Sequence, residues 1–117
     1  MLDQLPMYQR KGKEAYLPNL SRMKEFCSYL NSPEKKIKTI HIAGTNGKGS
    51  TAHMISSVLQ EAGYRIGLYT SPHLNDFRER IKINGSLIEK KYITKFVQSN
   101  REYIDANSLS FFEMTVG

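Results

Sequence analysis

The most informative stretch of this sequence is Gly44-Thr45-Asn46-Gly47-Lys48-Gly49-Ser50, which holds three glycines within six residues. Glycine lets the backbone adopt positive φ and approach a ligand closely, so such a turn can direct several N–H groups at one anion. The N-terminus of a following helix would add free N–H groups and the positive end of its dipole. The stretch therefore predicts a phosphate-binding loop.

The side chains of this loop suit the tail of a triphosphate. Lys48 would bring a full charge to the β- and γ-phosphates, and Ser50 and Thr51 offer hydroxyls for the Mg²⁺ that accompanies ATP. The pattern G-x-x-x-x-G-K-[ST] is matched incompletely, because Ile42 replaces the first glycine and Gly49 the final hydroxyl residue. A glycine-rich turn that binds nothing is the simpler alternative. The predicted ATP-binding residues are Gly44, Thr45, Asn46, Gly47, Lys48, Gly49, Ser50 and Thr51, with Lys48 as the catalytic residue.

The segments on both sides of the loop predict a βαβ unit. Residues 37–43 are mostly β-branched or small, which is typical of a strand buried on both faces of a parallel sheet. Residues 50–62 predict a helix that Gly63 ends, and residues 66–70 predict a second strand. A right-handed crossover would make the two strands parallel. We therefore expect an α/β fold: a P-loop NTPase-like, mostly parallel sheet flanked by helices, incomplete in this chain.

The N-terminal part of the chain predicts one further helix. An irregular arm over residues 1–18 precedes a helix that would begin at an Asn19 or Ser21 cap and run to about residue 31. Cys27 is the only cysteine, so no internal disulfide can form. Its place in an apolar helical stripe favours an inert buried thiol over a nucleophile.

The C-terminal half predicts a hairpin and two helices. Asn84-Gly85 is a hairpin signal between a short strand near residues 80–83 and Leu87-Ile88. Helices are expected over residues 92–105 and from about residue 111. The apolar residues expected to face the core from the predicted helices are Leu20, Met23, Phe26, Cys27, Leu30, Ile55, Val58, Leu59, Ala62, Ile93, Phe96, Val97 and Ile104.

Length and charge limit the functional classes. A chain of 117 residues favours one domain. Lys and Arg number 17 against 11 Asp and Glu, a balance of +6 that attracts polyanions. The basic residues are scattered, however, and we expect no nucleic-acid partner. The N-terminus lacks the apolar stretch of a signal peptide and no run reaches membrane-spanning length, so a cytoplasmic protein without a membrane partner is expected.

Three motifs occur in order along the chain and point to a known family. They are His41 to Thr51, then Tyr69 to Leu74 followed by Phe77 and Glu79-Arg80-Ile81, and then Phe111 to Thr115, with a weaker match at Asn19 to Met23. Together they resemble the signatures of folylpolyglutamate synthases and the related bifunctional dihydrofolate synthases. These enzymes belong to the Mur ligase family, whose peptidoglycan members usually carry Thr at the position of Gly49. The resemblance implies that residues 1–117 are the N-terminal portion of the ATP-binding domain, with the rest of that domain and a C-terminal domain absent.

The resemblance also implies the metal ligands, ATP and Mg²⁺ being the cofactors. Ser71 would be one Mg²⁺ ligand, compensating for Gly49 after Lys48, and Glu113 a second. Ser71 follows the carboxyl end of a predicted strand, where open α/β sheets bind ligands. Glu113 is an acid within an apolar run, so it needs a cation or another partner. A carboxylate that stabilises a helix N-terminus is the alternative for Glu113.

His73, Arg80 and Phe112 are the candidate substrate residues. His73 would contact substrate or simply cap its loop. Arg80 would pair with a substrate carboxylate or form a surface pair with Asp76. Phe112 would shape a pterin pocket, as the corresponding region of the family does, or pack in the core.

The reaction that the resemblance implies is amide formation. The γ-phosphoryl of ATP would move to a folate or dihydropteroate carboxylate, and the amine of L-glutamate would attack the acyl phosphate. The full-length protein is expected to be a monomer, and this chain alone to be inactive. Two other classes stay open: a different P-loop enzyme such as a small-molecule kinase, and a basic binding module without enzymatic activity.

Overall fold

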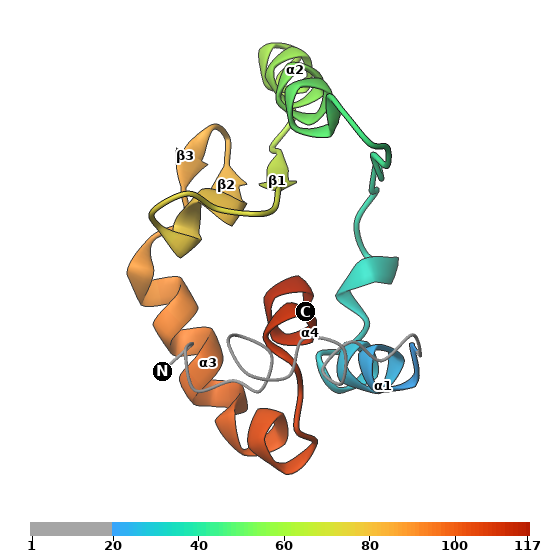
Figure 1. Ribbon diagram of the computed structural model, residues 1–117, viewed down its shortest axis with the longest axis vertical. Coiled ribbons are helices and arrows are strands. Elements are labelled where there is room, and N and C mark those ends of the chain that lie inside the picture. Colours follow the sequence, from blue (N-terminus) through green and yellow to red (C-terminus); the bar gives the residue numbers. More distant parts are fainter. Residues whose placement is uncertain (1–19) are drawn as a thin grey trace. The chain divides into compact units, whose positions relative to one another are not determined.

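The computed structural model describes residues 20–117, which fall into two compact units. Unit 1 contains the described residues up to Thr39 together with Ser99–Gly117, and unit 2 contains Ile40–Gln98. Figure 1 shows the helices and strands in chain order. The arm predicted over residues 1–18 and the Asn19 cap lie outside the described residues.

Unit 1 is helical. It contains α1 (Ser21–Tyr29), the short 3₁₀ helix η2 (Pro33–Lys35), the end of α3 (Lys90–Ala106) and α4 (Phe111–Val116). The fully buried Phe26 ring stacks on Tyr103 with 5.6 Å between ring centroids, and Tyr29 stacks on both, with its centroid 4.0 Å from Tyr103 and 6.4 Å from Phe26. Aromatic packing of this kind joins α1 to the end of α3. The other buried residues in the described part of unit 1 are Ile104, Leu109, Ser110, Phe111, Met114 and Thr115.

The ends of α1 differ in part from the prediction. Leu20 takes the N-cap position without a side-chain hydrogen bond, and Ser21 is already helical, so the Ser21 cap is wrong. At the other end Asn31 has φ of 66°, and the N–H of Ser32 reaches back to the carbonyl of Cys27 at 2.7 Å. A residue in the left-handed conformation followed by such a bond is a common way for a helix to end. Cys27 is half-buried, and burial, followed by the nearby Glu34, raises the pKa of its thiol, which agrees with an unreactive group.

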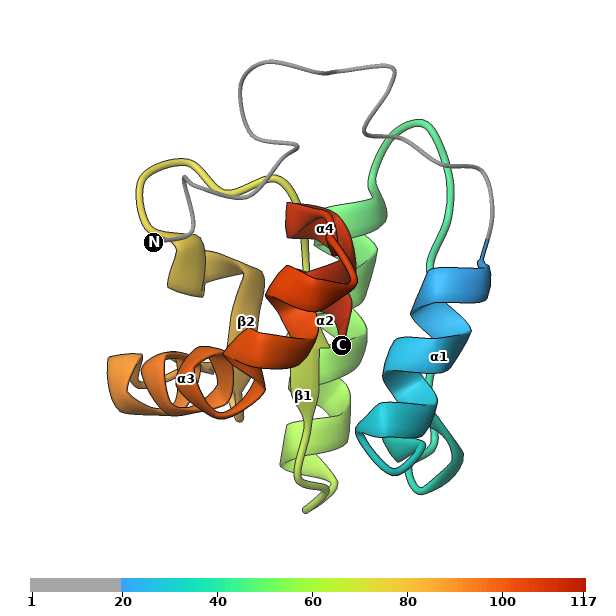
Figure 2. The ribbon, with the colours of Figure 1, turned by 90° about the horizontal axis from the view of Figure 1, so that it is seen from below.

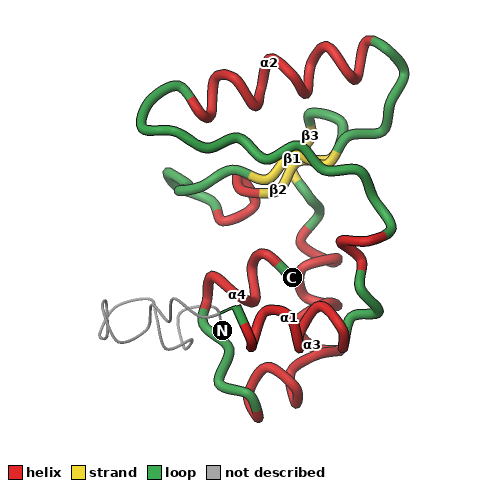
Figure 3. The backbone as a smooth tube through the Cα atoms, turned by 90° about the vertical axis from the view of Figure 1, so that its right-hand side faces the viewer, coloured by secondary structure: helices red, strands yellow, loops and turns green. Residues whose placement is uncertain are grey.

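Unit 2 places one long helix beside a small sheet. Helix α2 (Lys48–Glu61) lies next to β1 (Gly67–Tyr69), and Figure 2 shows both running together. The short helix η3 (Phe77–Arg80) leads into β2 (Ile81–Ile83), and β3 (Ser86–Leu87) follows. The strand order is β1-β2-β3 and both pairings are antiparallel (Figure 3). The first part of α3 completes the unit.

The predicted parallel sheet is not present among the described residues. Residues 38–44 form neither helix nor strand, and Ile37 and Ile40 are 65% and 64% exposed. A strand needs a hydrogen-bonded neighbour, and in residues 20–117 the only partner of β1 is the antiparallel β2. The apolar composition of residues 37–43 therefore predicts a strand that this structure does not form. The α/β class and the strand at 66–70 are confirmed.

The boundaries of α2 match the prediction better than its buried face. Gly63 ends the helix with φ of 87°, and the N–H of Tyr64 bonds to the carbonyl of Leu59 at 3.0 Å. The expected core residues Val58 and Ala62 are exposed. The buried residue is Ser56, whose hydroxyl accepts a hydrogen bond of 3.0 Å from the Gln60 side chain. On α3 the predicted core side chains fit better, since Val97 and Ile104 are buried and Ile93 and Phe96 are half-buried.

The hairpin is also confirmed. Asn84 and Gly85 both have positive φ, 48° and 81°, the conformation of a type I′ turn. Asn84 exchanges two hydrogen bonds with Ile66: its N–H donates to the Ile66 carbonyl at 2.9 Å, and its Oδ1 accepts from the Ile66 N–H at 2.8 Å. Among the described residues, no helix is both long enough and apolar enough to span a membrane.

Candidate functional site

The phosphate loop ends where α2 begins. Gly47 occupies the N-cap position of α2 with φ of 76°, in the left-handed region that favours glycine, and Lys48 is the first helical residue. No side chain caps this N-terminus, and its first turn holds no acidic residue. The first N–H groups of a 14-residue helix are therefore not bonded by a capping side chain. Such an end attracts anions.

Lys48 lies folded over the loop that precedes it. Its Nζ donates to the carbonyl of Gly44 at 2.6 Å and to the carbonyl of Thr45 at 3.2 Å, both at exposed positions. The positive charge is thus held at the bend itself, beside the start of α2. The structure therefore brings together the loop backbone, the helix N-terminus and the lysine that the sequence predicted as parts of one site.

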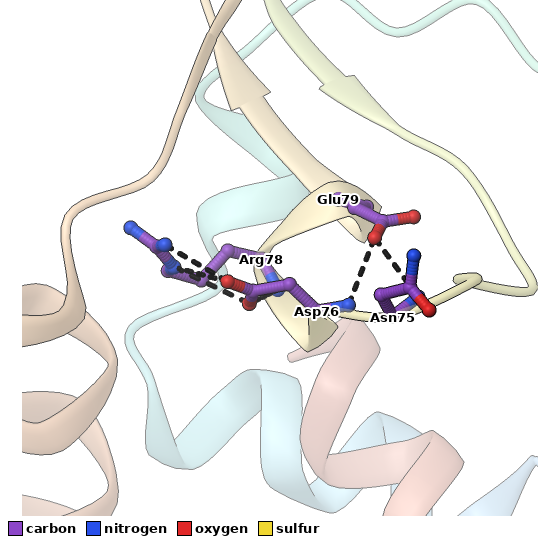
Figure 4. A network of polar contacts seen from close by, with 4 residues as sticks. All are labelled: Asn75, Asp76, Arg78 and Glu79. Carbon is purple, nitrogen blue, oxygen red and sulfur yellow. Dashed lines mark hydrogen bonds and ion pairs between the residues drawn. The ribbon is translucent and has the colours of Figure 1, made fainter.

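A second loop, residues 71–80, is organised by one carboxylate. Glu79 accepts hydrogen bonds from three consecutive backbone N–H groups: Leu74 at 2.9 Å, Asn75 at 3.0 Å and Asp76 at 2.8 Å. Figure 4 shows the bonds to Asn75 and Asp76. These bonds, from Leu74 first, lower the pKa of Glu79 because they favour its charged form. Glu79 is thus held as a carboxylate that fixes the turn.

Asp76 forms the second contact within this loop. Its Oδ1 accepts from the Arg78 backbone N–H at 2.9 Å, capping η3, and its Oδ2 pairs with Arg78 Nη2 at 2.8 Å (Figure 4). The side-chain bond to Arg78 lowers the pKa of Asp76 and raises that of Arg78. The surface pair of Asp76 with Arg80, one of the two predicted alternatives, is therefore wrong, because Arg78 takes that place.

His73 and Arg80, both predicted substrate residues, contact each other. Arg80 Nε donates to His73 Nδ1 at 2.7 Å, and the His73 ring stands edge-on to Phe77 with 6.1 Å between centroids. Both side chains are half-buried. Ser71, the predicted metal ligand, is exposed two residues after β1 and precedes Pro72 through a cis peptide bond. Loop 71–80 thus carries three of the predicted site residues.

Glu113 lies in unit 1 and already has partners. Its Oε2 accepts from the Ser110 N–H at 2.9 Å and pairs with Arg22 Nη2 at 3.0 Å, while Oε1 accepts from Arg22 Nε at 3.2 Å. The Glu113 N–H donates to Ser110 Oγ at 3.1 Å, which completes a capping box on α4. Glu113 therefore has the alternative role that the sequence predicted, that of a carboxylate at a helix N-terminus. Phe112 on the same helix is 50% exposed, whereas Phe111 is buried, so the residue that packs in the core is Phe111.

The side-chain oxygens of the described residues limit the ways in which Mg²⁺ could be bound. Within residues 20–117, no three His, Cys, Asp or Glu side chains are grouped as a metal site. Asp76, Glu79 and Glu113 are bonded to Arg or to N–H groups, and the hydroxyls of Ser50 and Ser71 are neutral oxygen donors. Mg²⁺ commonly binds one or two protein ligands, with substrate phosphates and water completing its shell. The residues present fit an ion that arrives with a nucleotide, and they do not fit a cage built by the protein alone.

Sequence reasoning missed the roles of Arg22 and Glu79. A signal for Glu79 existed, because Asp76 and Glu79 stand in the spacing of a capping box. Both capping bonds are present at η3. Ser110 and Glu113 show the same spacing. Arg22 had no such signal, because its partner Glu113 lies 91 positions further along the chain.

Comparison with known proteins adds independent evidence on what this chain is similar to. No protein-family model matches the chain. The dihydrofolate synthase/folylpolyglutamate synthase of Bacillus subtilis is 48% identical over 89 residues, which are 76% of this chain and 21% of that protein. The crystal structure of the folylpolyglutamate synthase of Thermotoga maritima is 41% identical, with a TM-score of 0.81 over 86% of this chain and 25% of that one. A Mycobacterium tuberculosis folylpolyglutamate synthase complexed with ADP and AMPPCP is 33% identical, with a TM-score of 0.70 over 83% of this chain and 24% of that one. The chain spans about a quarter of the length of each of these three proteins.

Proposed function

We propose that this chain, which matches part of the enzymes of the folylpolyglutamate synthase and dihydrofolate synthase family, is the N-terminal portion of the ATP-binding domain of such a ligase. The full-length protein would add L-glutamate to the carboxylate of a folate, or of dihydropteroate, at the expense of ATP. One observation supports this most directly: a glycine bend places Lys48 at an N-terminus of α2 that no side chain caps. That arrangement is suited to a nucleotide phosphate.

ATP would bind along Gly44–Thr51. The N–H groups at the start of α2 would bond the phosphate oxygens, and Lys48 would turn from the carbonyls of Gly44 and Thr45 to the γ-phosphate. The similar protein from Mycobacterium tuberculosis was crystallised with ADP and AMPPCP, which supports nucleotide binding by the full-length protein. Lys48 would then stabilise the charge that develops as the phosphoryl group transfers.

Ser71 and Glu113 are the residues that we propose for Mg²⁺. When bound, the ion would neutralise charge on the transferring phosphoryl group. Ser71 is exposed and supplies a hydroxyl oxygen. Glu113 would exchange at least one of its contacts with Arg22 for the metal or a water on it, while Ser110 Oγ continues to accept the Glu113 N–H and to cap α4.

The acceptor substrate would approach loop 71–80. Arg80 and His73 are in contact there, so a guanidinium and an imidazole lie side by side in this loop. Phe112, which is half exposed on α4 of unit 1, is a separate candidate and would offer apolar surface to the ring system of the substrate. The acceptor carboxylate would take the γ-phosphoryl group, and the resulting acyl phosphate would then react with the amine of L-glutamate, releasing phosphate. The protein's contribution is mainly positioning and charge stabilisation.

We also propose that residues 37–43 form a parallel strand in the full-length protein, which would act as a monomer. Ile37 and Ile40 are largely exposed here although both are strong strand formers. Strands from the remaining three quarters of the enzyme would pair with this segment and bury it. Hydrogen exchange in the full-length protein should show protection over residues 37–43, and rapid exchange there would contradict this part of the proposal.

The function is tested by omitting one substrate at a time. Phosphate release by the full-length protein should require ATP, the folate or dihydropteroate acceptor and L-glutamate together, and the product should gain one glutamyl residue by mass spectrometry. A small-molecule kinase would transfer phosphate without L-glutamate. A basic binding module would bind nucleic acid in a salt-sensitive way that survives Lys48→Ala. Either of these results would overturn the proposal.

A further inference from the structure

The shape of loop 71–80 rests on polar bonds more than on burial. Within the loop, Leu74 has 88% of its surface exposed, so this apolar side chain contributes almost nothing to holding the turn. Its backbone N–H, in contrast, is bonded to Glu79 Oε2 at 2.9 Å. The next two N–H groups, of Asn75 and Asp76, share Glu79 Oε1 at 3.0 and 2.8 Å. Both oxygens of one carboxylate thus hold three consecutive peptide units.

The same carboxylate lies between the two parts of the loop that carry predicted substrate residues. Glu79 is adjacent to Arg80, and the first amide it holds, that of Leu74, is adjacent to His73. Arg80 Nε and His73 Nδ1 are 2.7 Å apart. A displacement of either chain segment would therefore separate this pair. Charge-assisted hydrogen bonds to a carboxylate are about twice as strong as neutral ones, which suits them to hold an exposed turn.

We propose that Glu79 is a positioning residue for the acceptor substrate: by gathering the N–H groups of Leu74, Asn75 and Asp76 it holds His73 and Arg80 in one arrangement. It touches no reacting atom and acts through the loop. The proposal rests on the proposed function for its substrate, and on the hydrogen bonds alone for its geometry. An ordered loop binds its ligand without first losing conformational freedom, so Glu79 should influence acceptor binding more than nucleotide binding.

The test compares Glu79→Ala and Glu79→Gln with wild type in the full-length protein. Glu79→Ala removes all three acceptor bonds, whereas Glu79→Gln keeps one carbonyl oxygen and replaces the other with a donor that cannot accept an N–H. We expect the Ala variant to raise the KM for the acceptor about tenfold while the KM for ATP stays within about twofold, with the Gln variant between it and wild type. Hydrogen exchange in peptides that cover residues 72–80 should accelerate in the same order.

Glu89→Gln is the matched control, because Glu89 is also an acidic residue of unit 2 and pairs with Lys91 at an exposed position. It should leave both KM values and the exchange of residues 72–80 unchanged. The proposal is overturned if Glu79→Ala leaves that exchange unchanged, or if it raises both KM values equally. If the wild-type protein ligates no glutamate, the proposed function fails, and the exchange measurement alone decides whether Glu79 holds the loop.

Discussion

The two loops of unit 2 differ in how their backbone N–H groups are bonded. Loop 44–50 is bent by glycine, and the helix N-terminus that follows it is left without a capping side chain. Loop 71–80 contains its own anion, since Glu79 satisfies three N–H groups that water or a ligand would otherwise bond. The first loop therefore leaves donors available for an external anion, whereas the second uses an internal anion to fix its shape.

The difference separates binding from positioning. Unsatisfied N–H groups are a cost that an arriving phosphate can recover, so the first loop should gain order when it binds. The second is ordered before it meets a ligand, and its charged groups are already paired as Asp76 with Arg78 and Glu79 with the backbone. Substitutions in the two loops should therefore fail in different ways.

The largest effect is expected at Lys48. Lys48→Ala in the full-length protein should lower kcat/KM about 100-fold, because a charge directed at the transferring phosphoryl group is lost. Its melting temperature without nucleotide should change little, since both bonds that Lys48 makes are at exposed positions. Lys95→Ala, on an exposed face of α3, serves as the control. Enzyme kinetics and nucleotide-dependent thermal shift measure the effect, and an unchanged nucleotide shift would remove Lys48 from the site.

A smaller effect is expected at Gly47. Gly47→Ala should lower the free energy of unfolding by about 1–2 kcal/mol, because an alanine must then adopt a left-handed conformation. A new Cβ would meet nothing within 4 Å, so the cost is conformational and not steric. Gly49→Ala is the matched control, since Gly49 lies within α2 and also has open space around it. It should be neutral or stabilising by up to about 1 kcal/mol. The measurement is denaturant unfolding without nucleotide. Equal free energies of unfolding for the two variants would contradict the interpretation.

A third effect, smaller again, is expected at Asp76. Asp76→Ala removes both the cap of η3 and the pair with Arg78, and should lower the melting temperature by less than Gly47→Ala does. Arg78→Ala removes the pair but keeps the backbone cap, and should lower it less still, because exposed ion pairs contribute little. Thermal unfolding of both variants separates the two contributions. Equal losses would show that the cap contributes nothing.

The smallest expected effect is a dependence of folding stability on pH in the acidic range. The pKa of Glu79 is lower in the folded protein, so its contribution to stability is fully present above the unfolded value of about 4.3 and is lost as pH falls through the folded value. The melting temperatures of wild type and Glu79→Gln should therefore differ at neutral pH and converge on acidification. A difference that grew towards low pH would have the wrong sign for a carboxylate held by N–H groups.

Local signals in the sequence predicted the elements well. The stop at Gly63, the turn at Asn84-Gly85 and the buried face of α3 all depend on neighbours in the chain, and each appears in the structure. The strand over residues 37–43 does not, because its hydrogen-bond partners would be remote in sequence. The buried Ser56 on α2 shows the same limitation, since a helix alone cannot reveal which face its neighbours cover.

The candidate site divides in the same way. Glycine content and a lysine at a helix start identify the phosphate loop without knowledge of the fold. The contact between His73 and Arg80 depends on the path of the loop between them, and the pairing of Glu113 with Arg22 joins opposite ends of the chain. Composition cannot indicate such partners. The roles of Ser71, Glu113 and Phe112 stay predictions until the full-length protein is tested.

The exchange of two hydrogen bonds between Asn84 and Ile66 has a practical consequence for engineering. It joins Ile66, just before β1, to Asn84, just after β2, and so helps to set the alignment of the two strands from outside loop 71–80. A slip of one residue would break both bonds and turn every strand side chain to the opposite face. We therefore expect loop 71–80 to tolerate replacement by the loop of a relative without a change in the register of β1 and β2.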